Sequence, residues 1–435
     1  MTAFTPLELG LIGAGVLVVL AVLGVRIAFA AAFVGTFGLV AMLGWDIGIK
    51  TAGVIPHAKT VTYTLSVLPM FILIGYLAYY AGMTQAAFEA GRRWFGWLPG
   101  GLAVATVYAV AGFSAVSGAS TAAAAVFAQV AIPEMQKSGY SQRLAAGVVA
   151  AGSTLDSLIP PSALLVVYGI IVEQSIGKLL IAGFVPGIFS ALVYTAIIVT
   201  ICTLRPDYGR PITGYSWRER FASLPGTFPI VLVVCIIFTA MFYGWATPTE
   251  AGALGAFCVF LIALWNRMTW MELRDALVDT ARLTVMIFTI IWGVLIFVRF
   301  LGFAGLPTTI SSWITGLDVP PIVVLLAIYL IYLVLGMFMD AIGMLLLTLP
   351  IVYPIVMDLG YDPIWFGIIV VKLCGIGLLT PPVGLCCFVV NGVRPDIPLT
   401  DIFRGVMPFI VADILTVAVL TAFPEIVTFI LEFAY

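Results

Sequence analysis

Charged residues are scarce in this chain of 435 residues. The 19 Lys and Arg and 21 Asp and Glu make up 9% of it, whereas 63% of the residues are hydrophobic. Soluble domains are about 25% charged and about 45–50% apolar. A soluble fold of this length has too little interior for so much apolar surface, and the same composition excludes a disordered chain. The formal net charge of −2 also lacks the basic footprint of a nucleic-acid-binding protein. These shortages predict an integral membrane protein.

Histidine and cysteine are rare as well. His57 is the single histidine, and the six cysteines lie in apolar runs without the spacing of a metal site. We expect these cysteines to be small buried hydrophobes. A membrane-embedded enzyme would need a clustered nucleophile and base, or a set of metal ligands. The sequence supplies little material for either, so a non-enzymatic role is favoured.

Long apolar runs are abundant, and they decide between helices and a barrel. Residues 11–23, 230–241 and 319–339 are continuous apolar segments, whereas barrel strands alternate in polarity over short stretches. We therefore predict an α-helical bundle. At about 20 residues per crossing, the length allows roughly a dozen spans. The first run has no Ala-x-Ala-like cleavage site, and we interpret it as a first span rather than a signal peptide.

Polar segments divide the chain into two halves, 1–204 and 227–435. The connecting segment 205–226 contains four arginines, so the positive-inside rule places it in the cytoplasm. Residues 83–97 mix cations with tryptophans and are predicted to lie at the membrane interface. Residues 269–282 begin with a capping-box pattern and are amphipathic. This second segment is predicted to be an interfacial helix or, alternatively, a packed connecting helix.

The two halves contain an internal repeat with an offset of 221 residues. Chance matches of Leu or Val mean little here, but matched Pro and Gly-Tyr positions fix backbone geometry. Without any gap, the matched residues are Pro99 with Pro320, Pro133 with Pro354, Gly139-Tyr140 with Gly360-Tyr361, and Leu158, Pro160, Pro161 and Leu164 with Leu379, Pro381, Pro382 and Leu385. We interpret this as a true duplication.

Each half contains an apolar segment that a Pro-Pro pair interrupts, at residues 152–162 and 375–384. Proline removes backbone donors and frees carbonyls, which need a partner inside a bilayer. Broken helices at corresponding positions of two repeats are typical of a transporter's binding site, where unwound carbonyls coordinate Na⁺ and half-helix N-termini face anions. The alternative is that the two kinks only shape the packing.

A second irregular element precedes each break. Residues 113–121 contain three Ser, one Gly and one Thr within an apolar run, which suggests a re-entrant hairpin tip that offers oxygens to an ion or substrate. A small-residue packing patch is the alternative. In the second half, residues 336–343 contain Asp340, one of few acids inside the apolar segments. Asp340 either lies on the ion or substrate path or caps a hairpin.

These residues resemble a known family over nearly the whole chain. The similar motifs are Leu98-Pro99-Gly100-Gly101-Leu102-Ala103, Ser117-Gly118-Ala119-Ser120, Ile132-Pro133-Glu134-Met135, Gly139-Tyr140, Leu158-Ile159-Pro160-Pro161-Ser162, Ala246-Thr247-Pro248-Thr249-Glu250-Ala251, Asp362-Pro363-Ile364-Trp365-Phe366-Gly367 and Thr380-Pro381-Pro382-Val383-Gly384. Together they resemble the large membrane subunit (the DctM-type M subunit) of TRAP transporters, the tripartite ATP-independent periplasmic transporters.

The resemblance implies a fold, a function and partners. The fold would be an all-α, inverted-repeat, elevator-type transporter with two re-entrant hairpins and two Pro-Pro-broken helices. The function would be Na⁺-coupled import of organic acids (dicarboxylates, sialic acids or other sugar acids) across the bacterial inner membrane. A small four-span membrane subunit and a periplasmic substrate-binding protein would be partners, besides membrane lipids. No organic cofactor is implied.

The resemblance also implies two Na⁺ sites, formed mostly by backbone carbonyls. The first would use Ser114, Ser117, Asp156, Ile159 and Pro161. The second would use Gly336, Gly377, Thr380 and Val383. The 221-residue offset places Asp156 opposite Gly377 and Ile159 opposite Thr380, so the resemblance and the repeat agree. Candidates for the substrate path are Gly118, Ser120, Thr121, Ser162, Asp340, Lys372 and Pro382.

Two residues depart from the family pattern. Asp156 replaces a usual Gly and is interpreted as an extra cation ligand or a titrating group. Lys372 occupies a helix that is usually neutral there. Its charge would neutralise a substrate carboxylate, pair with an acid, or reach towards the membrane surface. An Asp156–Lys372 pair across the pseudo-symmetric site is one possibility.

Two other functions stay open at this stage. One is a stand-alone ion-coupled organic-anion carrier of another elevator family, which would work without a binding protein. The more remote alternative is a membrane-embedded enzyme.

Overall fold

The computed structural model describes residues 4–60, 62–117, 120–212, 214–316 and 319–433, and these residues form helices and turns without a β-strand. Five helices are long and apolar enough to cross a membrane, or up to seven if each of two bent pairs forms one span. Shorter apolar helices pack among them. This arrangement confirms the predicted all-α membrane fold.

The helices fall into two series, one in each half of the chain. The first series is α1 (Pro6–Val22), α2 (Ile27–Leu43), α3 (Trp45–Thr60), α4 (Val67–Tyr80), α5 (Met83–Phe95), α6 (Gly101–Ser117), α7 (Ser120–Lys137), α8 (Gln142–Ser153), α9 (Ala163–Ile171) and α10 (Ile176–Leu204). The second is α11 (Trp217–Phe242), α12 (Pro248–Trp265), α13 (Trp270–Ala304), α14 (Leu306–Thr315), α15 (Pro321–Gly336), α16 (Ala341–Asp358), α17 (Pro363–Gly377), α18 (Leu385–Val393), α19 (Leu399–Ala422) and α20 (Glu425–Thr428).

The 221-residue offset holds for the helices along most of the chain. A shift of 221 residues superimposes α7 on α16 at both ends, and it aligns the first residues of α2 and α12 and of α8 and α17. The same shift places α3 and α4 on the single long helix α13, and α5 on α14. The duplication is therefore visible in the helix boundaries as well as in the prolines.

The segment 269–282 is not a separate interfacial helix. It forms the first part of α13, a continuous helix of 35 residues. The Thr269–Glu272 capping box starts this helix, as predicted, but neither Gly nor Pro follows before Gly293 to end it. The Tyr80 hydroxyl donates to the Asp279 carboxylate at 2.9 Å, so this part of α13 packs against α4. The repeat partner of α5 is α14 instead.

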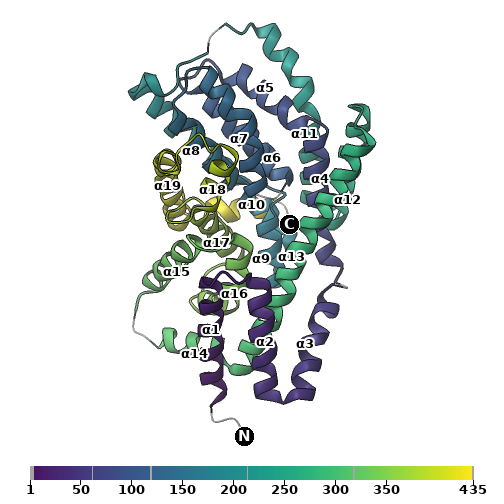
Figure 1. Cartoon of the computed structure of the whole chain (residues 1–435), viewed down its shortest axis with the longest axis vertical. Helices are drawn as coiled ribbons and strands as arrows, with labels where there is room; N and C mark the ends of the chain where they lie inside the picture. The colour runs from purple at the N-terminus through teal and green to yellow at the C-terminus, as the bar shows by residue number, and fades with distance from the viewer. Residues whose placement is uncertain (1–3, 61, 118–119, 213, 317–318, 434–435) are drawn as a thin grey trace.

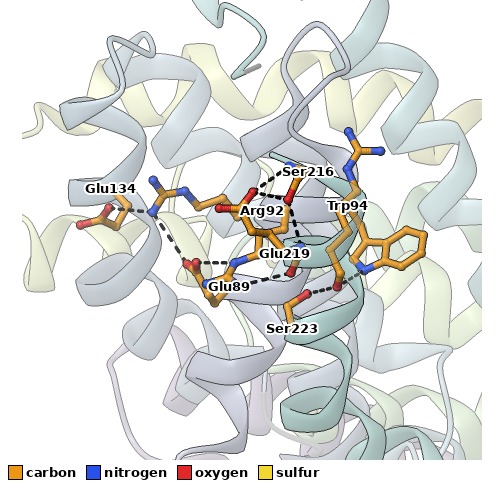
Figure 2. A network of polar contacts seen from close by, with 9 residues as sticks. Glu89, Arg92, Trp94, Glu134, Ser216, Glu219 and Ser223 are labelled. Atoms are coloured by element: carbon orange, nitrogen blue, oxygen red, sulfur yellow. Dashed lines mark hydrogen bonds and ion pairs between the residues drawn. The ribbon is translucent and has the colours of Figure 1, made fainter. Parts of the chain in front are cut away.

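The polar connection between the halves is also shorter than the predicted 205–226. Helix α11 begins at Trp217, where Ser216 and Glu219 form a reciprocal capping box. Figure 2 shows that the start of α11 lies against α5, with the Trp94 indole donating to the Arg220 carbonyl at 3.1 Å. On the other side of α5, Arg92 lies 3.6 Å from Glu134 of α7. Helix α5 thus connects α11 with the α6–α7 hairpin.

We divide the helices into two groups according to their place in each repeat, and their arrangement can be followed in Figure 1. We call α1–α5 and α11–α14 the scaffold, in which α13 packs along α2 and α4 packs against α12 and α13. We call α6–α10 and α15–α19 the bundle. Within the bundle, α7 packs against α18 and α16 packs against α9. Each hairpin therefore contacts the second part of the other repeat's broken helix, which is the reciprocal pattern of a pseudo-two-fold arrangement.

Candidate functional site

The first broken helix is interrupted between α8 and α9. After Ser153 the chain makes one 3₁₀ turn, Thr154–Ser157, and passes through the Pro160-Pro161 cis bond before α9 begins at Ala163. The Ser162 hydroxyl donates to the Ser157 carbonyl at 2.7 Å and also caps α9. Ser162, a predicted path residue, is thus buried and closes the break locally.

The second broken helix is interrupted between α17 and α18. Helix α17 ends at Gly377, and the Pro381-Pro382 bond that follows is also cis. The Thr380 hydroxyl donates to the Ile376 carbonyl at 2.7 Å, and Gly384 adopts a left-handed conformation before α18. A hydroxyl that donates its proton keeps its oxygen lone pairs, so Thr380 remains able to coordinate a cation.

The two breaks meet in the interior of the bundle. A Cβ atom built on Gly377 would lie 2.5 Å from the Gly336 Cα, so the end of α15 and the end of α17 are in direct backbone contact. A Cβ on Gly375 would lie 3.4 Å from the Ser157 Oγ, so α17 also crosses the first break. The structure thus brings together Gly336 and Gly377, which the resemblance assigned to one site. Thr380 and Val383 follow in the same break.

The acid of the first break contacts the first hairpin. The Asp156 carboxylate is buried, and the Ser120 hydroxyl at the start of α7 lies 2.8 Å from both of its oxygens. Ser120 therefore links the hairpin to the break. Ile159 is half-buried and Pro161 is buried beside them. The side chains of Ser114 and Ser117, and the whole of Gly118, lie outside the described residues.

Lys372 pairs with an acid, but the acid is Asp413 rather than Asp156. The Lys372 ammonium lies 2.6 Å from Asp413 Oδ1, and each side chain is 1% exposed. The Tyr194 hydroxyl donates to Asp413 Oδ2 at 2.8 Å, and its ring centroid is 5.5 Å from the ammonium. Lys372 faces α10 and α19, whereas Asp156 is engaged by Ser120 at the break.

Asp413 and Tyr194 were missed by the sequence reasoning. The available signal was an aspartate in the middle of the apolar helix α19, since an acid within a membrane helix needs a partner.

The remaining predicted path residues have varied environments. Asp340 caps α16 by accepting from the Ile342 amide at 3.1 Å, so the capping interpretation is confirmed. Thr121 is half-buried and Pro382 is exposed. Within the described parts of the chain, no three His, Cys, Asp or Glu side chains form a group that would hold a metal ion. A cation held at the crossing of the breaks would depend on carbonyl and hydroxyl oxygens, joined by Asp156.

Two repeats of membrane helices, each with a hairpin and a broken helix, and two breaks that meet inside the bundle define a secondary transporter. The comparison with known sequences identifies the family. A family profile, the DctM component of tripartite ATP-independent periplasmic transporters, matches residues 14–426. The chain therefore belongs to the DctM family, as the sequence motifs predicted, and its relatives are permeases of the bacterial inner membrane.

Two relatives and one solved structure illustrate the similarity. The chain is 36% identical over 366 residues to the C4-dicarboxylate TRAP transporter large permease protein DctM of Pseudomonas aeruginosa, covering 84% of this chain and 85% of the relative. It is 33% identical to the sialic acid TRAP transporter large permease protein SiaM of Vibrio cholerae, covering 83% and 85%. The crystal structure of the Alcanivorax borkumensis YdaH transporter shares the fold, with a TM-score of 0.60, 14% identity and coverage of 88% and 90%.

Proposed function

We propose that this chain is the membrane transport subunit of a Na⁺-coupled importer of organic acids. The family membership supports organic-acid transport as the general role, since the relatives named above carry C4-dicarboxylates and sialic acid. The family works with a small membrane subunit and a periplasmic binding protein. We propose that the small subunit has four spans and that the binding protein delivers the acid to this chain.

The contact between Gly336 and Gly377 is the observation that supports Na⁺ coupling most directly. Backbone contact at this point allows carbonyls of α15 and α17 to face one small volume. Thr380 adds a hydroxyl oxygen in the same break. Na⁺ is a hard cation, and unwound carbonyls in paired broken helices are its usual ligands in transporters. We propose this as one Na⁺ site, completed by Val383.

The contact between Asp156 and Ser120 supports the second proposed Na⁺ site. The carboxylate is buried in the bundle and contacts a hydroxyl rather than a cationic side chain. A buried carboxylate needs a compensating charge or hydrogen bonds. In our proposal a Na⁺ ion supplies that charge, with Ile159 and Pro161 contributing carbonyls.

The proposed transport cycle moves the bundle against the scaffold. The hairpins and broken helices pack with one another across the repeats, so the bundle can move as one body. Na⁺ binding at the crossing would order both breaks and present the half-helix N-termini to the substrate carboxylate. The scaffold would hold the position of the bundle relative to the bilayer.

The test of Na⁺ coupling is uptake by the purified chain, reconstituted with its small subunit and supplied with its loaded binding protein. Thermal-shift screening of the binding protein first identifies the acid. We expect uptake under an inward Na⁺ gradient and none under an equal K⁺ gradient. An uptake rate that is the same with and without the Na⁺ gradient contradicts the proposed Na⁺ coupling. Uptake of free acid without the binding protein indicates the stand-alone carrier instead.

The test of the ion site is a pair of matched threonine variants. Thr380 and Thr280 each donate to the carbonyl four residues earlier at 2.7 Å, but Thr280 lies in the scaffold helix α13. We expect the Thr380→Val variant to need about ten times more Na⁺ than the wild type for the same rise in unfolding temperature. The Thr280→Val variant should need the same Na⁺ concentration as the wild type. If the two variants show the same Na⁺ dependence of thermal stability, Thr380 is not a ligand of the proposed site.

A further inference from the structure

A cleft between the scaffold and the bundle contains cationic side chains from two helices. The cavity has a volume of about 980 Å³ and is lined by one side of α3, the last turns of α13 and the turn between α9 and α10. Lys50 of α3 and Arg299 of α13 line it together with Glu173 of the turn, so the formal charge of these three residues is positive. The remaining lining is mostly apolar, including Ile171 and Phe303.

Arg299 is the one charged residue in the apolar part of α13, residues 283–304, and this helix qualifies as a membrane span. Its guanidinium lies 5.3 Å from the centroid of the Phe303 ring, one turn further along α13. In the described parts of the chain it has no carboxylate within salt-bridge distance. An ionisable side chain in a membrane helix without an acidic partner is a sign of function. Lys50 is only loosely paired, since its ammonium is 3.8 Å from Asp46 and both side chains are largely exposed.

The positive-inside rule orients the cleft towards the periplasm. Helix α10 has 29 residues and is therefore about 43 Å long, enough to cross the bilayer. Glu173 lies just before its first residue, whereas the segment 205–216, which contains Arg205 and Arg210, follows its last one. The positive-inside rule places that segment in the cytoplasm. Figure 1 shows that α3 lies at one end of the molecule, whereas α5 and the start of α11 lie towards the opposite end.

The internal repeat places no cation at the positions that correspond to Arg299 and Lys50. A shift of 221 residues relates Arg299 to Ala78 and Lys50 to Met271, so neither cation has a cationic counterpart on the cytoplasmic face. The acid Glu173 corresponds to Arg394, which reverses the sign. Duplication alone would give both faces the same side chains. The two cations therefore do not follow from the duplication that produced the symmetric core.

We propose that this cleft is a docking site for a small organic carboxylate on its way to the crossing of the broken helices. Arg299 binds the carboxylate through its planar pair of donors, and Lys50 adds a second, mobile charge. The apolar walls accommodate the carbon skeleton of the acid. Because two walls belong to the scaffold and one to the bundle, movement of the bundle opens or closes the site. The inference rests on the proposed function, since it assumes that the transported solute is an organic anion.

The first experiment measures the cleft's preference for anions without any transport. Gly302 lines the cleft, and a Cβ built on it meets no atom within 4 Å, so Gly302→Cys introduces a thiol there. Cys235→Ser and Cys258→Ser remove the two native thiols that are not buried. The rates of modification by an anionic sulfonatoethyl and a cationic trimethylammonium-ethyl methanethiosulfonate are compared in phosphatidylcholine nanodiscs.

We expect the thiol to react faster with the anionic reagent than with the cationic one. Arg299→Gln should lower the ratio of the anionic to the cationic rate about three- to tenfold, because this is the effect of one nearby charge in a partly exposed cleft. Arg299→Lys should retain most of the ratio. Succinate should slow anionic labelling when Arg299 is present, whereas neutral succinamide should not. An unchanged ratio in Arg299→Gln overturns the proposal, because the guanidinium then only reaches out to the membrane surface.

Two further measurements distinguish a site for the transported acid from a site for a lipid. If phosphatidylglycerol in the nanodisc protects the thiol and succinate does not, the cleft binds a lipid headgroup and the proposal is wrong. In proteoliposomes we expect Arg299→Gln to raise the KM for the transported acid and to leave the Na⁺ dependence unchanged. If the wild-type chain transports no organic acid, the proposed function fails, but the labelling ratio still reports whether the cleft selects anions.

Discussion

The buried pair of Lys372 and Asp413 allows a quantitative test of how the bundle is held together. It connects α17, the helix before the second break, with α19, and Tyr194 attaches α10 to the same carboxylate. Removal of one partner leaves an uncompensated charge in the interior, whereas apolar replacement of both leaves none. The single variant is therefore expected to lose much more stability than the double variant.

The size of the effect follows from the geometry. At 2.6 Å and an effective dielectric constant of about 20, the attraction between the two charges is about 6 kcal/mol. The loss of water from each ion opposes this by several kcal/mol, so the net value of the pair is small. Lys372→Met alone should reduce the free energy of unfolding by about 3–5 kcal/mol, because Asp413 stays buried and keeps only the Tyr194 hydroxyl. Lys372→Met with Asp413→Leu should be within about 2 kcal/mol of the wild type.

The assay is reversible unfolding of the purified chain in mixed micelles of maltoside and SDS at fixed Na⁺, followed by tryptophan fluorescence. Arg210→Gln is the control, because Arg210 and Asp207 form a pair at 3.7 Å whose side chains are 78% and 92% exposed. This control should change the stability by less than about 1 kcal/mol. A single Lys372→Met variant as stable as the control refutes the buried pairing. A double variant that loses the sum of both single changes refutes the uncompensated-charge argument.

The other predictions concern the crossing of the breaks and the surface. Gly377→Ala should abolish Na⁺-dependent thermal stabilisation, because its Cβ would lie 2.5 Å from the Gly336 Cα, whereas Gly392→Ala, whose Cβ meets nothing within 4 Å, should preserve it. Equal Na⁺ responses in the two alanine variants would argue against a site at this contact. At the surface, two hydrogen bonds from Arg394 hold the pKa of Asp396 below its ordinary value of 3.8. The stability contributed by this lowered pKa is present above pH 3.8 and is lost as the pH falls through the folded-state pKa. We expect Asp396→Asn to reduce the change of the unfolding midpoint with pH in this range. An unaltered dependence on pH would show that another group titrates there.

The predictions from sequence succeeded where local chemistry decides the backbone. The two Pro-Pro pairs interrupt their helices within the predicted segments, because proline lacks a backbone donor wherever it occurs. The capping box at Thr269 starts a helix for a similarly local reason. The predicted end of that helix was wrong, since an amphipathic start does not reveal whether the helix continues into a following apolar run.

Two features of the site required the tertiary structure. The partner of Lys372 is 41 positions away in the chain, and the rotation of α17 and α19 about their axes decides that the two side chains meet. The contact of Gly336 with Gly377 likewise depends on the crossing of two helices from the same repeat. In the sequence each of these glycines is one of 43, and their proximity is not apparent without the fold or the family resemblance.

The sequence by itself determined that this protein is a membrane helix bundle built from two repeats, each with a broken helix. Scarcity of charge and placement of proline act residue by residue, through the cost of transferring charge into lipid and the loss of a backbone donor. The tertiary structure decided which polar groups compensate one another: Ser120 with Asp156, and Lys372 with Asp413. The physical reason is that pairing of buried charges depends on distances of a few Å between helices, which packing sets and helical periodicity alone does not.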